Sequence, residues 1–345
     1  MASYRYEATA LTDGNEAWIT MKMNRIRTKI VAGMVGLLGT VAWASPISSA
    51  ARTVIPSDVQ QIISVDYRTV KNSGTALALK AQVLPDDLKE FEKALKGINI
   101  NPDRDLESLT FASFRNGKQG LKMIEVASGS FSSKTVLKKL RLQAVKPVKY
   151  HDSDLYPMSK EMAMTFLDDN TLLFGDDSAL RAALNVRDGD TPALDSNRHV
   201  AHMIRSVEKA AVWSVLDRQG SQDMLLLVLG DKRKIPDYES INNRVVGSHC
   251  AMSFKDGVKF RLDVLTADPN TSAKLSALLK MGILYKKVSA APGQKIALEN
   301  MRVNSDRSDL QMHFKADPKQ FQALLHSQFF AAVSPSPADQ VQMHQ

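Results

Sequence analysis

His199 and His202 are the nearest approach to a metal-binding motif in this sequence. Both fall on a short segment for which a helix is expected, and residues three apart share one helix face. Two imidazoles placed in this way could hold a zinc ion, which takes three or four protein ligands. The neighbouring acidic residues Asp195 and Glu208 do not show ligand spacing. We therefore interpret both histidines as surface residues, keep them as the metal-ligand candidates, and expect no cofactor.

His249 precedes Cys250, the one cysteine of the chain. An imidazole beside a thiol could produce a nucleophilic thiolate. In a strand, however, neighbouring side chains point to opposite faces. Cys250 shares its strand phase with three apolar residues, Val246, Met252 and Phe254. This pattern predicts a small core residue, and a lone cysteine cannot close an internal disulfide.

Other common catalytic motifs are missing. The sequence contains no Gly-x-Ser-x-Gly elbow, no His-Glu-x-x-His motif and no Gly-Lys-Ser/Thr ending of a phosphate loop. The acidic pairs at 86–87, 168–169 and 176–177 fall at turns or helix starts, where carboxylates pair with free N–H groups. We predict a protein that is not an enzyme. A hydrolase whose site assembles only in three dimensions, around one of the three histidines named above, is the alternative.

Two basic clusters could form a surface for an anionic partner. They are Lys138, Lys139 and Arg141 on one expected helix, and Lys232, Arg233 and Lys234 further along the chain. Such a partner would be an envelope protein, an anionic lipid or a glycan. Residues 1–44 hold five basic and three acidic residues, so the net charge falls from +8 for the whole chain to +6 without them. Because this charge is small and spread out, we expect no nucleic-acid partner.

Residues 21–44 have the three parts of a secretory signal peptide. A basic segment at 22–29 precedes the uncharged stretch Ile30–Val41, and Ala42-Trp43-Ala44 supplies the small residues that signal peptidase reads. We expect cleavage between Ala44 and Ser45. The apolar stretch is shorter than the roughly 20 residues that span a bilayer, so no transmembrane span is expected in the mature chain.

Residues 1–20 are too acidic and polar to precede a signal peptide, which indicates that translation starts at Met21 or Met23. We expect an exported protein, either periplasmic or extracellular. No cysteine lies near the cleavage site to carry a lipid anchor.

Four hairpins stand out in the remaining chain. Their turns fall at Asn116-Gly117, Asp168–Asn170, Asp256-Gly257 and Asn304–Ser308, each between runs of apolar residues. A helix signal follows each hairpin. Its expected caps are Ser132 or Ser133, Asp176 or Asp177, Asp268 before Pro269, and Asp317 before Pro318.

A strand and a helix also precede each pair of hairpins. These are 62–70 and 73–96 in one half, and 211–217 and 221–229 in the other. Corresponding elements lie about 140 residues apart. We predict an α+β fold with antiparallel sheet built by internal duplication, β-α-ββ-α-ββ-α written twice. The repeats are 45–190 and 191–333, joined near 188–199, with a disordered tail at 334–345; one sheet or two stays open.

Several runs resemble uncharacterised exported bacterial proteins of repeated hairpin–helix layout. The runs are Ile55–Val59, Ile63–Asp66, Gly97–Asn99, Asp105–Thr110 and the strand pair Leu167–Gly175. The resemblance covers most of the mature chain but is one of layout. It implies the α+β fold and provides no catalytic residues.

The function expected from these features is that of an exported, non-enzymatic binding or interaction protein of the cell envelope. A further alternative is a carrier that holds an apolar ligand between sheet and helices, lined by residues such as Met158, Met162 and Met164.

Overall fold

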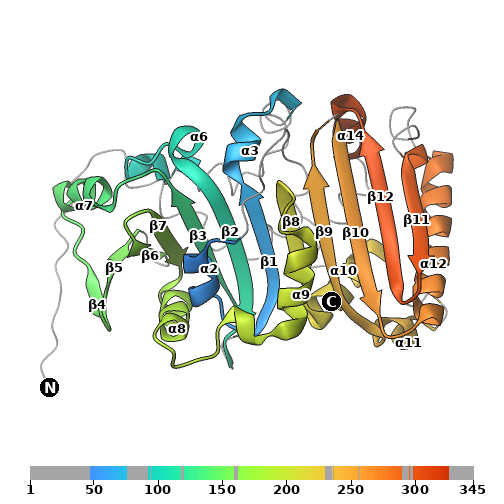
Figure 1. Ribbon diagram of the computed structural model, residues 1–345, viewed down its shortest axis with the longest axis horizontal. Helices are drawn as coiled ribbons and strands as arrows, with labels where there is room; N and C mark the ends of the chain where they lie inside the picture. The colour runs from blue at the N-terminus through green and yellow to red at the C-terminus, as the bar shows by residue number, and fades with distance from the viewer. Residues whose placement is uncertain are drawn as a thin grey trace, which may run out of the picture.

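A computed structural model describes residues 47–75, 92–93, 95–117, 120–158, 162–229, 235, 237–255, 257–289, 295 and 298–325. Within these ranges the chain forms one open sheet of twelve strands in the order β11-β12-β10-β9-β8-β1-β2-β3-β7-β6-β5-β4 (Figure 1). Every pair of neighbouring strands is antiparallel. The predicted α+β class with antiparallel hairpins is confirmed, and the two halves share one sheet.

The strands of the first half are β1 (Val59–Asp66), β2 (Leu106–Arg115), β3 (Leu121–Gly129), β4 (Val148–Tyr150), β5 (Ser153–Pro157), β6 (Ala163–Asp168) and β7 (Thr171–Gly175). Those of the second half are β8 (Val212–Leu216), β9 (Val245–Ser253), β10 (Val258–Thr266), β11 (Met301–Asp306) and β12 (Asp309–Ala316). The four expected hairpins are β2–β3, β6–β7, β9–β10 and β11–β12, and all four are present.

The two halves meet where β1 pairs with β8, with Ile63 opposite Ser214. Counted outward from this seam, the order is β1-β2-β3-β7-β6 on one side and β8-β9-β10-β12-β11 on the other. On both sides a central strand is followed in space by one hairpin and then by a second hairpin, whose later strand lies nearer the seam. A duplicated unit would give this order, although the duplication itself stays a prediction. The hairpin β4–β5 extends the first half only.

Side chains alternate between the two faces along each strand. Both faces carry apolar residues, and helices pack on both. On β1, Ile62 belongs to one core cluster while Ile63 and Val65 belong to the other. The face that we call the front carries α2 (Ser49–Val54), α8 (Asp177–Arg187), the short 3-10 helix η5 (Leu194–Ser196) and α9 (Arg198–Val207). These helices lie before the strands in Figure 1.

The opposite, back face carries most of the remaining helices. They are α3 (Tyr67–Lys71), α7 (Ser133–Leu142), α10 (Arg218–Leu229), α11 (Tyr238–Asn242), α12 (Pro269–Ser289) and α14 (Pro318–Leu325), all of which bury side chains in the second core cluster. The one-turn helix α6 (Pro102–Asp105) leads into β2. Each half of the sheet is thus packed on its back face.

The expected helix caps are largely confirmed. Asp176 accepts a hydrogen bond from the Ala179 N–H at 2.8 Å, Asp268 from Thr271 at 2.9 Å and Asp317 from Gln320 at 2.9 Å. Ser132 occupies the N-cap position of α7, but its hydroxyl makes no capping hydrogen bond.

Two expected boundaries were wrong. The strand predicted at 62–70 ends at Asp66, because its carboxylate accepts the Thr69 N–H at 3.0 Å and starts helix α3 instead. The helix predicted at 221–229 begins at Arg218, since Asp217 accepts the Gly220 N–H at 2.8 Å. Most of the helix predicted at 73–96, the signal peptide, the cleavage site at Ala44 and Ser45, and the tail at 334–345 lie outside the described residues.

Candidate functional site

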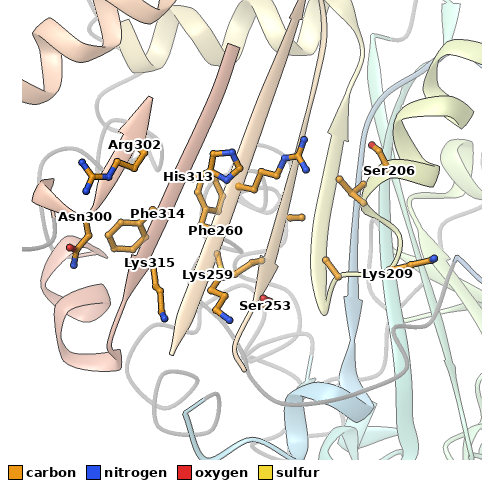
Figure 2. A pocket seen from close by; sticks show the side chains of 15 residues that line it. Ser206, Lys209, Ser253, Lys259, Phe260, Asn300, Arg302, His313, Phe314 and Lys315 are labelled. Atoms are coloured by element: carbon orange, nitrogen blue, oxygen red, sulfur yellow. The ribbon is translucent and has the colours of Figure 1, made fainter. Parts of the chain in front are cut away.

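A groove lies on the front face of the second half, beside the end of α9. Its volume is about 630 Å³. Its polar lining is dominated by six basic or imidazole side chains, Lys209, Lys259, Arg261, Arg302, His313 and Lys315, and none of its lining residues is acidic. Figure 2 shows Lys259, His313 and Lys315 on neighbouring strands, with Arg302 on one side and Lys209 on the other. The groove is therefore a candidate site for an anion.

Strand alternation places these cations on the front face. On β10, Val258, Phe260, Leu262 and Val264 point into the back core. The residues between them, including Lys259 and Arg261, must face forward. The same rule holds on β12, where the back-facing residues Met312 and Phe314 alternate with His313 and Lys315.

The cations oppose one another across the strands. His313 lies directly opposite Arg261 on β10 and Arg302 on β11, and Lys315 lies opposite Lys259. Neighbouring strands are about 4.8 Å apart, so one anion bound over these three strands would meet several basic side chains.

Asp263 offsets part of the positive charge at the inner end of this face, with Asp309 nearby. Asp263 Oδ2 lies 2.6 Å from Arg261 Nε and 3.2 Å from His249 Nε2. Burial raises the pKa of the Asp263 carboxyl, but contacts with His249 and Arg261 outweigh it and the net pKa is lowered. The buried His249 Nδ1 has no hydrogen-bond partner in the described structure. Asp263 thus offsets part of the Arg261 charge.

The outer cations lack such compensation. Lys209, Arg302 and Lys315 are exposed. No carboxylate of the described residues comes within ion-pair distance of these three side chains. Because uncompensated charges on one surface add to a common potential, the outer part of the groove is positive.

The histidines considered as metal ligands lie next to this face but do not form a cluster. His199 and His202 are exposed on α9. A Cβ added at Gly247 would lie 3.0 Å from His199 Nε2, which places this imidazole over β9. Among the described residues, no group of three or more His, Cys, Asp or Glu side chains could hold a metal ion.

Cys250 and His249 lie on opposite sides of β9, as expected. His249 faces Asp263 on the front, whereas Cys250 lies opposite Leu262, which packs on the back core. Burial raises the pKa of the Cys250 thiol to about 12, so the thiolate is disfavoured. The expected phase was wrong at Val246, because a register shift near the end of β10 puts Val245 in the core instead.

The basic cluster predicted on α7 lies at the other end of the sheet. Lys138, Lys139 and Arg141 are exposed there, and Lys139 and Arg141 occupy the last helical turn. The second predicted cluster, Lys232, Arg233 and Lys234, lies outside the described residues. The cations that the fold brings together are therefore a different set. Their sequence signal was alternation: Lys259, Arg261, His313 and Lys315 are each separated from the next front-facing residue by a buried apolar one.

The methionines proposed for an apolar ligand pack in the back core of the first half. Met164 is fully buried, and Met158 and Met162 are partly buried against the same cluster. Glu125 lies on this side too, 3% exposed between Phe111 and Phe174 of the adjacent strands. Its Oε2 is buried without a hydrogen-bond partner in the described structure, and burial raises its pKa to about 8.

Another histidine–carboxylate pair occurs at the edge of the first half. His151 Nδ1 lies 2.8 Å from Asp188 Oδ2, and Tyr150 donates to Asn185 Oδ1 at 2.6 Å. Arg187 donates to the Ser153 hydroxyl at 2.7 Å. These contacts fix the β4–β5 hairpin to α8.

Comparison with known proteins gives a fold likeness only. No family model matches the chain, and neither does any curated protein. Among solved structures, crystal form I of TP0453 matches with a TM-score of 0.46 and 10% identity, over 82% of this chain and 98% of that one. Crystal form III of TP0453 gives 0.46 and 8%, over 79% and 96%. At this distance we draw no argument about function from TP0453.

None of the helices in the described part of the chain is both long enough and apolar enough to cross a bilayer.

Proposed function

We propose that this protein is an exported, non-enzymatic binding protein whose second-half groove binds an anionic partner. The observation that carries the proposal is the set of basic and imidazole side chains that oppose one another on three adjacent strands. Arg261 and Arg302 flank His313 in one row, and Lys259 lies opposite Lys315 in the next. An anion bound there would be within reach of basic side chains from all three strands.

The side chains of the groove suit carboxylate, sulfate or phosphate groups. Arginine presents a planar fork of N–H donors to such oxyanions, and lysine adds a point charge. Phe260 and Phe314 also line the groove, and both pack against the back core.

Binding is favoured over catalysis by the neighbours of the groove histidine. A general base is commonly oriented by a carboxylate, as in the Ser-His-Asp arrangement. His313 instead has an arginine directly opposite on each side. This arrangement suits holding a negative charge.

The test compares two triple variants that remove the same charge. One is Lys259→Gln/Arg302→Gln/Lys315→Gln in the groove, and the other is Lys138→Gln/Lys139→Gln/Arg141→Gln on α7. Binding to polyglutamate, heparin and anionic vesicles is measured at several salt concentrations. We expect the groove variant to lose at least about tenfold in affinity for one of these probes, and its binding to become less salt-dependent.

The α7 variant should bind as the unmodified protein does. Equal losses in both variants would show that net charge alone drives binding, and a loss in the α7 variant only would move the site to the surface predicted from sequence. For the export part of the proposal, N-terminal sequencing of the secreted product should begin at Ser45; a product that retains residues 1–20 would contradict it.

A further inference from the structure

Helix α8 covers the front of the first half at a defined place. It packs on β3, β6 and β7 and buries Leu180, Ala183 and Leu184. Beneath it runs a row of paired residues, Ala163, Gly175 and Ile124, on β6, β7 and β3. A Cβ added at Gly175 would lie 3.4 Å from the Ala179 Cβ, so the helix sits close against this row.

The corresponding strands of the second half, β10, β12 and β11, have no such cover among the described helices. Helix α14 follows β12 as α8 follows β7, and each begins after an aspartate cap. However, Phe321 of α14 packs in the back core, its ring 6.1 Å from that of Phe314. Among the described residues, no helix therefore covers the front of β10, β12 and β11 where α8 would be expected (Figure 1).

A helix lies beside the seat of α8 in the first half, and a helix lies beside the groove in the second half. In the first half, α2 precedes β1 and packs beside α8. In the second half, α9 precedes β8, and the groove is lined by Val207 at the end of α9 and by Ala210 just after it. The groove thus has a sheet floor and a helix on one side, as the seat of α8 has.

The floor differs in chemistry. Gly175 and His313 are each the fifth residue of their strand. The row across Gly175 is Ala163–Gly175–Ile124, whereas the row across His313 is Arg302–His313–Arg261. Apolar and small residues under α8 are thus replaced by cations in the groove.

We propose that the groove receives an acidic α-helix of a partner protein, docked in the place that α8 fills in the first half. This inference rests on the proposed function and names the partner class. Carboxylates at i, i+3 and i+4 of a helix lie about 5–6 Å apart. Cations on neighbouring strands are spaced by about 4.8 Å, so one helix face can meet several of them.

The test uses two labelled peptides of identical sequence and charge. One is an all-L peptide with glutamates at i, i+3, i+4 and i+7, and the other carries D-residues at central positions so that it cannot form a helix. Fluorescence anisotropy measures affinity for the full protein. We expect the helical peptide to bind at least about tenfold more tightly, and its helical circular dichroism to increase on binding.

Two protein variants make the test specific for the groove. Lys259→Gln/Arg302→Gln/Lys315→Gln removes the charges, and Ser253→Trp fills the groove without changing charge. Both should weaken helix binding, while the α7 triple variant should not. Loss of binding in Ser253→Trp supports occupation of the groove by a helix-sized ligand.

The outcomes separate this inference from the proposed function. If both peptides bind the groove equally, or only heparin or anionic vesicles bind there, the helix inference is wrong while anion binding stands. If no anionic probe binds in a groove-dependent way, both are wrong.

Discussion

Glu125 is a buried carboxyl in the back core of the first half. Its carboxyl is buried between Phe111 and Phe174, with one oxygen that lacks a hydrogen-bond partner in the described structure. Burial disfavours the charged form and raises its pKa from 4.5 to about 8. Near neutral pH this side chain is held in its protonated form by the fold.

This shift predicts how stability changes with pH. Between the unfolded pKa and about pH 8, the native state binds more protons at Glu125 than the unfolded state does, so stability falls as pH rises through this window. The contribution is on the order of 3 kcal/mol between pH 5 and pH 8. In Glu125→Gln, urea unfolding at several pH values should show this part of the slope removed.

The exposed Glu299 provides the control for this measurement. Glu299→Gln should keep the pH slope of the unmodified protein. If Glu125→Gln keeps the same slope as well, the carboxyl titrates normally and is not buried as described.

For single residues, the sequence predicted correctly which face of a strand a side chain occupies, but it did not predict which side chains come together in the groove. Period-two alternation correctly placed Cys250 and His249 on opposite faces, since this depends on the strand alone. The groove cations come from β10, β11 and β12 and from the end of α9. Their proximity depends on strand order and register, which no local run of residues encodes, so the sequence pointed to the contiguous lysines of α7 instead.

For α8 and α14, the local sequence predicted that each helix forms but not the face of the sheet on which it packs. Each was predicted from an aspartate cap and helical spacing, and each is present. The face on which each packs could not be predicted, because a cap fixes where a helix begins and not its direction across the sheet. Among the described helices, that difference leaves the front of β10, β12 and β11 without the cover that α8 gives the first half.

The cap of α8 should contribute measurably to stability. Asp176 accepts hydrogen bonds from the Ala179 N–H and the Ser178 hydroxyl and lies 3.3 Å from Lys122 Nζ. We expect Asp176→Ala to lower the free energy of unfolding by about 1–2 kcal/mol, and Asp176→Asn, which can still cap, to lower it by less. Chemical denaturation measures both.

The matched control is Asp177→Ala at the next position. Asp177 makes an exposed ion pair with Arg181 one helical turn on, a type of contact worth a few tenths of a kcal/mol. A cost for Asp177→Ala as large as that for Asp176→Ala would contradict the assigned cap.

For the whole molecule, the main finding is that both halves belong to one sheet. The sequence predicted hairpin–helix units in the correct order but left open whether they formed one sheet or two. The pairing that joins them, β1 with β8, brings together residues about 150 positions apart. Each strand is apolar and would suit either arrangement, so only the assembled fold decides.

This joint predicts cooperative unfolding. Of the three tryptophans, Trp18 and Trp43 precede Ser45, so a protein produced from Ser45 onward for this test would hold only Trp213, which lies in β8 and is 1% exposed. We expect the fluorescence of Trp213 and the far-ultraviolet circular dichroism to report the same urea midpoint. Separate midpoints would mean that the halves unfold independently and that the seam contributes little.

The claim that the open front of the second half binds an anionic partner is tested most directly by lysine footprinting. The amines of the intact protein are labelled with and without polyglutamate, and each site is quantified by mass spectrometry. We predict that labelling of Lys209, Lys259 and Lys315 falls several-fold while that of Lys138 and Lys139 does not change. Uniform protection, or protection of the α7 lysines alone, would contradict the account.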